Sequence, residues 1–198
     1  MIENIADPIV KWLEKSGAIA ESEYRLHAYA IRSLLFGLAP VVIVVTLGMI
    51  TDMIYEGLMM ILPFMLIRKF SGGFHLTSPR LCFILSVVII GCALSFLKYA
   101  IYRNLTNILT CLAIISLLIL WFFSPIDSVA RRLSVKEKKW FGRLARIISL
   151  STFALYLSLI HYGFIESAYP MGMSIIISAS LQTPCLPKHF TKIKQKTR

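Results

Sequence analysis

Six long apolar runs, joined by short polar segments, dominate this sequence of 198 residues. A bilayer core of about 30 Å is crossed by about 20 apolar residues in a helix, and by fewer where end residues snorkel or the bilayer thins. Each run is therefore a candidate membrane span. Their approximate bounds are 33–50, 53–67, 81–97, 105–123, 147–164 and 171–186.

The composition supports this interpretation. Hydrophobic residues make up 57% of the chain and charged residues only 16%, and the mean hydropathy is +0.74. An ordinary soluble domain of this length is far more polar. We therefore predict an all-α polytopic membrane protein with about six transmembrane helices, forming a single membrane-embedded domain over residues 1–198 with the bundle at 33–187.

Polar segments flank the predicted bundle. In residues 1–30, apolar side chains recur at helical spacing among charged ones, which predicts an amphipathic helix that lies in the membrane interface or packs on the bundle. This start is acidic where a cleavable signal peptide would be basic, so no such signal is expected. The basic tail, 188–198, is expected to lie against anionic headgroups. The apolar positions near the start are Ile5, Ile9, Trp12 and Leu13.

The basic residues predict an orientation. The formal net charge is +11, with 21 Lys and Arg. If both termini are cytoplasmic, only Lys98 and Arg103 fall outside the inner segments, which is a strong positive-inside asymmetry. The loop from Arg68 to Arg80 is then cytoplasmic. Because the charge lies between apolar runs rather than on one folded face, the bilayer is the expected partner and nucleic acid is not.

The four cysteines do not form a metal-binding or disulfide pattern. They lack CxxC spacing, so reduced thiols are expected. Cys92 and Cys111 lie within apolar runs and are interpreted as packing residues. Cys185 is interpreted as inert, with acylation near the inner interface as the alternative. His75 and Cys82 offer only two ligands, so neither a metal nor another cofactor is expected.

The polar loop between the second and third runs reads FSGGFHLTSPRLCF, residues 70–83. Ser78 is a suitable N-cap for a helix whose first residue is Pro79. Cys82 then falls in or near the first helical turn. The positive end of the helix dipole and the nearby Arg80 both favour the thiolate, which is the nucleophilic form of cysteine.

His75 can fold back toward Cys82, because the loop before it contains Gly72 and Gly73. An imidazole that accepts the thiol proton is the general base of a cysteine nucleophile, and glycine backbone N–H groups can approach a reacting carbonyl. A histidine and a cysteine at this spacing often occur together without a shared function, so this pattern by itself does not establish a catalytic pair. Three residues remain open for orienting the imidazole: Ser71, Thr77 and Glu23.

The segment RKFSGGFHLTSPRLC resembles the signature of the accessory gene regulator B (AgrB) family, bacterial membrane cysteine endopeptidases. The resemblance extends to the length, the polar start, several spans and a basic segment before the last pair. It implies that His75 and Cys82 are catalytic and that Arg68 and Gly73 are the signature arginine and glycine. Together with Gly72 of the same loop, these two are the candidate oxyanion or substrate-positioning residues.

The resemblance also implies a function and partners. Such an enzyme removes the C-terminal tail from an AgrD-like propeptide through an acyl-enzyme thioester and promotes cyclisation of a quorum-sensing peptide at the bacterial cell membrane. A homodimer is the implied assembly. The basic segment ARRLSVKEKKWFGRLAR is either a binding site for an acidic precursor tail or a topology signal on anionic lipid. Its candidate tail-binding residues are Arg131, Arg132, Lys136, Lys138 and Lys139.

A small membrane transporter or exporter is the alternative. In that case His161, expected deep in the fifth run, and Glu56 would line a transport path. A neutral, hydrogen-bonded imidazole between helices explains His161 without any transport role, and this interpretation is favoured. The chain contains no internal repeat and no pair of interrupted apolar runs, which are typical of transporters.

Overall fold

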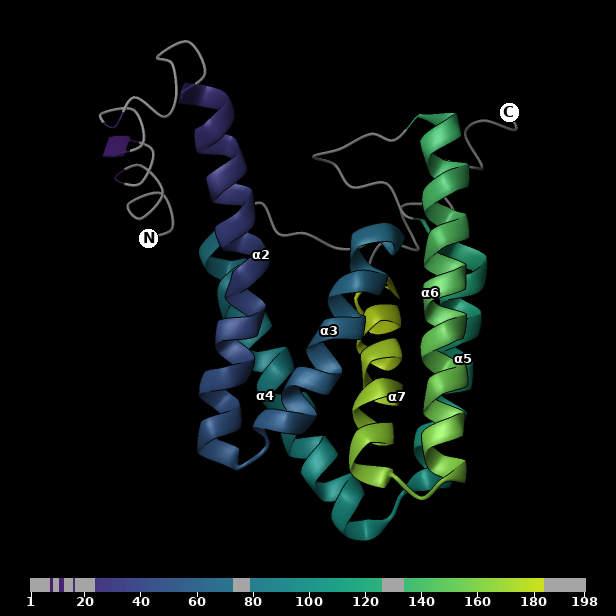
Figure 1. Cartoon of the computed structure of the whole chain (residues 1–198). Coiled ribbons are helices and arrows are strands. Elements are labelled where there is room, and N and C mark those ends of the chain that lie inside the picture. The colour runs from purple at the N-terminus through teal and green to yellow at the C-terminus, as the bar shows by residue number, and fades with distance from the viewer. Residues whose placement is uncertain are drawn as a thin grey trace. The chain divides into compact units, whose positions relative to one another are not determined.

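The computed structural model describes residues 8, 11, 12, 16, 24–72, 79–125 and 134–183. These residues contain no β-strand, and the long elements are all helices. The chain divides into two compact units, residues 1–43 and 44–198. The helices are α2 (Tyr24–Thr51), α3 (Ile54–Ser71), α4 (Pro79–Arg103), α5 (Thr106–Phe123), α6 (Val135–His161) and α7 (Ile165–Ser180) (Figure 1).

The first unit contains most of α2, with Pro40 inside the helix. In the region expected to form an amphipathic helix, the N–H of Ser16 donates to the carbonyl of Trp12 at 3.0 Å. The Trp12 side chain is exposed. The remaining residues of that prediction, and the tail 188–198, lie outside the described residues.

Among the residues that the structure describes, three helices are long and apolar enough to cross a membrane: α4, α5 and α6. The apolar part of α2, Gly37–Thr51, is shorter. The helix α7 has only 16 residues, and the last turn of α3 contains Arg68 and Lys69. The predicted class, an all-α membrane protein, is confirmed, although the apolar helices differ in length.

The bounds of the last two predicted spans need correction. Helix α6 begins at Val135, well before residue 147, because Ser134 and Glu137 form a capping box. The Ser134 Oγ accepts the Glu137 N–H at 3.3 Å, and Glu137 Oε2 accepts the Ser134 N–H at 2.8 Å. Helix α7 begins at Ile165 and ends at Ser180, earlier at both ends than the predicted 171–186. Its polar first turn, with Glu166, does not resemble a membrane span.

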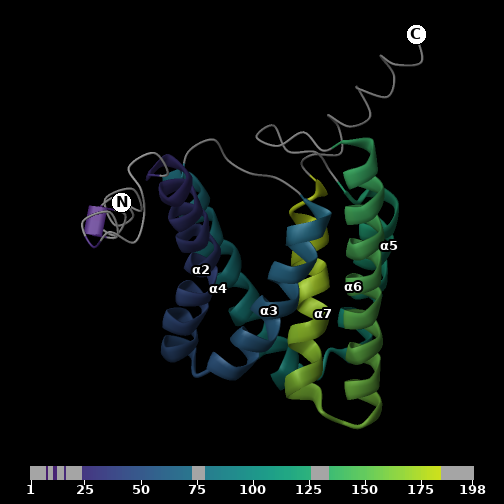
Figure 2. The ribbon, with the colours of Figure 1, turned by 45° about the horizontal axis from the view of Figure 1, so that its top comes forward.

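Helix α7 is the central helix of the second unit. It contacts α3, α4, α5 and α6, and Figures 1 and 2 show it between α3 and the α5–α6 pair. Small residues permit this packing, as they do in membrane bundles generally. A Cβ on Gly172 would lie 2.9 Å from Cε2 of Tyr156, so only glycine allows α6 to approach this closely.

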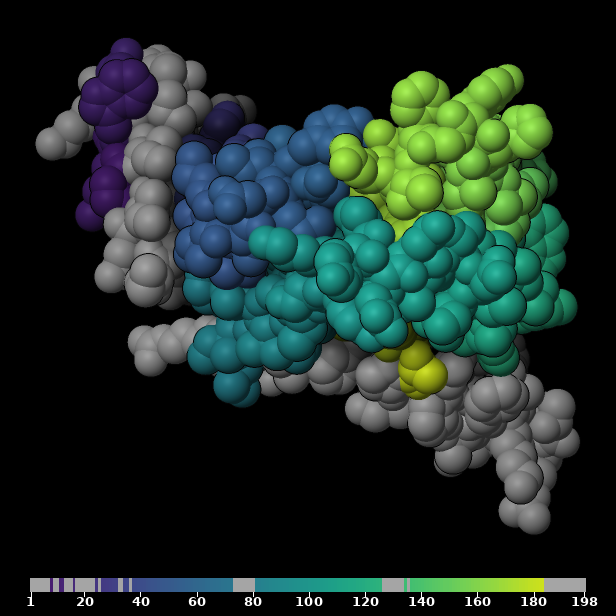
Figure 3. Space-filling model, turned by 90° about the horizontal axis from the view of Figure 1, so that it is seen from below, coloured from purple at the N-terminus to yellow at the C-terminus, as the bar shows by residue number. Residues whose placement is uncertain are grey.

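The helices of this unit meet at two ends with different connections. At the turn end, residues 52–53, 104–105 and 162–164 join consecutive helices. Figure 3 views this end, where the segments coloured blue, teal and light green lie next to one another. At the loop end lie the last residues of α3, α5 and α7 and the first residues of α4 and α6.

Candidate active site at the loop end

The last turn of α3 leads into the loop that contains His75. The Gly72 N–H donates to the Arg68 carbonyl at 3.2 Å, and Gly72 has φ 71° and ψ −155°. This backbone conformation requires glycine, because a side chain there would be strained. The Arg68 Cζ lies 6.0 Å from the centroid of the Phe64 ring. The structure therefore describes Arg68 and Gly72, whereas Gly73 and His75 lie outside the described residues.

Cys82 lies where the sequence predicted it. Helix α4 begins at Pro79, so Cys82 is in its first turn, with a free and partly exposed thiol. Its carbonyl accepts a hydrogen bond from Ser86 Oγ at 2.9 Å. The other described cysteines, Cys92 and Cys111, have free, exposed side chains, so the prediction that they pack in the interior is wrong. Among the described residues, no three His, Cys, Asp or Glu side chains gather at a potential metal site.

The ends of three helices converge on the carbonyl of Ser71, the last residue of α3. Gln182 Nε2 donates to this oxygen at 3.1 Å, and Ser124 Oγ approaches it at 3.5 Å. All three residues are buried, and Gln182 is completely inaccessible. We call Ser71, Ser124 and Gln182 the Ser71 clamp. The Ser71 hydroxyl donates to the Gly72 carbonyl at 3.3 Å, while Thr77 and Glu23, the other candidates for orienting His75, lie outside the described residues.

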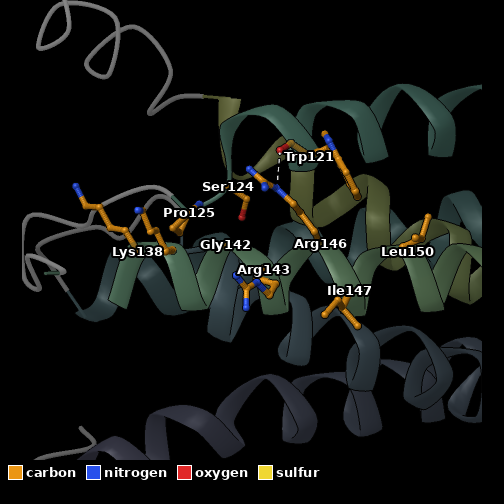
Figure 4. A pocket seen from close by; sticks show the side chains of 10 residues that line it. Trp121, Ser124, Pro125, Lys138, Gly142, Arg143, Arg146, Ile147 and Leu150 are labelled. Atoms are coloured by element: carbon orange, nitrogen blue, oxygen red, sulfur yellow. Dashed lines mark hydrogen bonds between the residues drawn. The ribbon is translucent and has the colours of Figure 1, made fainter. Parts of the chain in front are cut away.

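A groove beside the clamp has a volume of about 550 Å³, and we call it the basic groove (Figure 4). Of the predicted tail-binding residues, Lys138 and Lys139 line it, Lys136 does not, and Arg131 and Arg132 lie outside the described residues. The described residues that line it are Trp121, Ser124, Pro125, Lys138, Lys139, Gly142, Arg143, Arg146, Ile147 and Leu150. The groove therefore lies between the end of α5 and the first half of α6.

Two arginines of the groove, Arg143 and Arg146, lie in the predicted basic segment but were not among its five named candidate residues. Arg146 Nε donates to the Trp121 carbonyl at 3.1 Å, and Arg146 Cζ lies 5.5 Å from the Trp121 ring centroid, a cation–π geometry. Figure 4 shows this hydrogen bond beside Arg143. The sequence did contain a signal, because Lys139, Arg143 and Arg146 follow the i, i+4, i+7 spacing of one helix face. No signal in the sequence indicated that Trp121, which lies on another helix, would join this face.

Close packing joins the groove to the base of the loop. A Cβ on Gly142 would lie 2.8 Å from Cδ of Pro125, so glycine lets α6 approach the end of α5. The rings of Phe70 and Phe141 lie 5.9 Å apart between centroids and connect α3 with α6. Ser124 lines the groove and also belongs to the Ser71 clamp. The groove and the start of the His75 loop are therefore in direct contact.

The residues of the transporter alternative lie elsewhere. His161 is the last residue of α6, and its exposed ring lies against Tyr162 with centroids 5.5 Å apart. Glu56 is in the first turn of α3. Both residues are at the turn end, so the prediction that His161 lies deep in a span is wrong. The reason is that α7 begins at Ile165, which places the turn, and not mid-span, next to His161.

The family model described as accessory gene regulator B matches residues 2–186. The chain belongs to the accessory gene regulator B family. It is 24% identical over 192 residues to "Putative AgrB-like protein 2" of Clostridium perfringens strain 13, covering 92% of this chain and 89% of that protein. It is 23% identical over 188 residues to "Putative AgrB-like protein" of C. perfringens strain SM101, covering 91% of this chain and 85% of that protein. No solved structure is significantly similar to the chain.

Proposed function

We propose that this AgrB-family protein is a membrane cysteine endopeptidase that cleaves an AgrD-like propeptide at the cytoplasmic face, with Cys82 as nucleophile and His75 as general base. One observation carries the proposal: in a chain of this family, the partly exposed thiol of Cys82 lies in the first turn of α4, directly after the loop that contains His75. A helix N-terminus stabilises a thiolate through its unpaired N–H groups and its dipole.

In the first step, His75 accepts the Cys82 thiol proton, and the sulfur attacks the peptide carbonyl before the tail. The Gly72 N–H already donates to the Arg68 carbonyl, so we assign the neighbouring Gly73 N–H to the oxyanion that forms. The C–N bond then breaks, and His75 returns the proton to the leaving amine of the tail. The products are a thioester between the ring segment and Cys82, and a free tail peptide.

In the second step, a cysteine thiol of the bound ring segment attacks the thioester carbonyl and gives its proton to His75. The C–S bond to Cys82 breaks, and a thiolactone is released; a serine nucleophile in the peptide would give a lactone. Thioester exchange is nearly balanced in free energy, whereas cleavage of a peptide to a thioester is uphill. Product therefore accumulates only if the tail leaves and water is excluded from the thioester.

The basic groove is the proposed binding site for an acidic precursor tail. Four of its lining residues, Lys138, Lys139, Arg143 and Arg146, carry positive charge, and none of the described residues that line it is acidic. Opposite charge raises the local concentration of an anionic peptide and orients it. Because Ser124 belongs both to the groove and to the Ser71 clamp, a tail bound there would lie next to the start of the His75 loop.

Co-expression with a candidate precursor tests the proposal. The precursor is an amphipathic leader, a Cys-containing ring segment and an acidic tail, and mass spectrometry follows tail release and the covalent adduct. We expect tail release with the native protein only, and none with Cys82→Ala or His75→Ala. Cys82→Ser should likewise form no adduct and release no tail, because a serine hydroxyl is hardly ionised where a cysteine thiol is.

The same experiment distinguishes the transporter alternative. If all four forms release the tail equally, another protease cleaves the precursor and the proposed peptidase activity is wrong. Membrane levels of each variant, measured by immunoblot, control for poor insertion.

A further inference from the structure

Gln182 has a hydrogen-bonding pattern that stability alone does not explain. Its side chain is completely inaccessible, and its Nε2 donates to the Ser71 carbonyl. Among the described residues, its Oε1 is buried and has no hydrogen-bond partner. Rotating the amide would not help, because it would turn Oε1 toward another acceptor.

A buried amide that satisfies only its donor side is costly, because the unpaired acceptor loses its hydration. Methionine has nearly the same shape and would fill the site without that cost. The donated hydrogen bond therefore has a role besides net stability, and its position at the start of the loop indicates that role. It holds the carbonyl from which the chain continues, through Gly72, to His75 four residues after Ser71.

We propose that Gln182 is a positioning residue for catalysis: by holding the Ser71 carbonyl, it sets the point from which the loop presents His75 to Cys82. This inference rests on the proposed His75–Cys82 chemistry. Ser124 supports the same carbonyl more weakly, at 3.5 Å, and connects it to the basic groove. Gln182 itself does not touch the reacting atoms.

Alkylation of Cys82 by iodoacetamide tests this without any peptide substrate. The full-length protein in lipid nanodiscs carries Cys92→Ala, Cys111→Ala and Cys185→Ala, so Cys82 is its single thiol. Rates are measured at pH 7, where an ordinary thiol is mostly protonated, and at about pH 9.5, where it is mostly ionised without help. His75→Ala defines the rate without the base.

We expect Gln182→Met to slow alkylation at pH 7 by about tenfold, which brings the rate toward that of His75→Ala. This factor is the effect of losing one hydrogen bond of ordinary strength. At the higher pH the rate should equal the native rate, and the thermal unfolding midpoint should not fall. Thr183→Val is the matched control, because within the described part of the chain the Thr183 hydroxyl donates to carbonyls at the end of α7, those of Ala179 and Ser180, and not to the Ser71 clamp. Its rates should equal the native rates at both pH values.

Three results would overturn the inference. A Gln182→Met rate at pH 7 within twofold of native, with a slow His75→Ala, means that the clamp does not position the base. Equal slowing at both pH values means that only access to the thiol has changed. A native rate in His75→Ala removes the proposed dyad and the inference with it. If Gln182→Met does not fold, Ser124→Ala decides, with an expected slowing of about twofold at pH 7 alone.

Discussion

The two ends of the second unit are built differently. At the turn end, two or three residues join consecutive helices, and positive φ angles at Asp52, Asn104 and Gly163 make these turns tight. Tyr169 bridges the turn between α4 and α5, contacting Thr106 Oγ1 at 2.7 Å and Asn104 Oδ1 at 3.0 Å. At the loop end, residues 72–78 and 124–134 separate the helices, and the basic groove and Cys82 are found there.

The turn end therefore contributes mainly to stability, whereas the loop end carries the residues of the proposed chemistry. Short turns with satisfied polar groups hold helices in register, whereas functional residues are usually found on longer segments supported by a rigid scaffold. Charge follows the same division, because the groove residues are at the loop end and the turn end has few basic side chains. One of them, Lys98, donates to the Thr51 carbonyl at 2.9 Å and so stabilises the C-terminus of α2.

The largest expected effect is the loss of tail release when Cys82, but not Cys111, is replaced. Replacing Cys82 by Ala should reduce tail release by more than about 10³-fold, because no nucleophile remains. Cys111→Ala should release the tail at the native rate, since Cys111 lies exposed within α5. Mass spectrometry of co-expressed precursor measures both. Residual release by Cys82→Ala above this level would mean that the nucleophile lies elsewhere.

Gly142 tests how tightly the groove is packed. An added Cβ would overlap Pro125, so Gly142→Ala should lower the free energy of unfolding by about 1–3 kcal/mol. Gly37→Ala is the control, because a Cβ at Gly37 meets nothing within 4 Å. Denaturation in detergent micelles compares the two variants. Equal stability of both would show that α5 and α6 do not pack closely at this end.

A single charge reversal at each end compares their roles in tail binding. Arg143→Glu, in the groove, should raise the KM for the precursor roughly fivefold through lost attraction, with kcat unchanged. Arg103→Glu makes the same change of charge at the turn end, where Arg103 is the last residue of α4. Steady-state tail release at low and high salt measures both. Similar KM values for the two variants would reject the groove as the tail site.

The smallest effect is expected at the turn end. Tyr169→Phe removes the hydroxyl that contacts Thr106 and Asn104 and should cost about 1 kcal/mol of stability. Tail release per folded molecule should stay at the native rate. Thermal unfolding and tail release, measured on the same preparation, test this. A loss of release beyond the loss of folded protein would contradict the division between the ends.

Local signals in the sequence were sufficient for some features of the site. Pro79 begins α4 because its fixed φ suits the first helical position, and Cys82 falls in the first turn as a direct consequence. Ser134 and Glu137 carry a capping-box signature at the start of α6, a local signal that the hydropathy-based span 147–164 did not use. The hydropathy pattern was less informative at α7, whose polar start shifted the predicted span, and this shift misplaced His161 as well.

The amino-acid sequence by itself determined the membrane class, most helix positions, the placement of Cys82 and the concentration of basic residues in a few segments. Only the tertiary structure placed α7 at the centre, brought Gln182 and Ser124 to the Ser71 carbonyl, and combined Trp121 with Arg143 and Arg146 in one groove. The reason is that apolarity does not identify the buried faces of a membrane helix, since lipid and protein interior are equally apolar. Contacts between residues distant in sequence depend on close packing of small side chains, which hydropathy does not record.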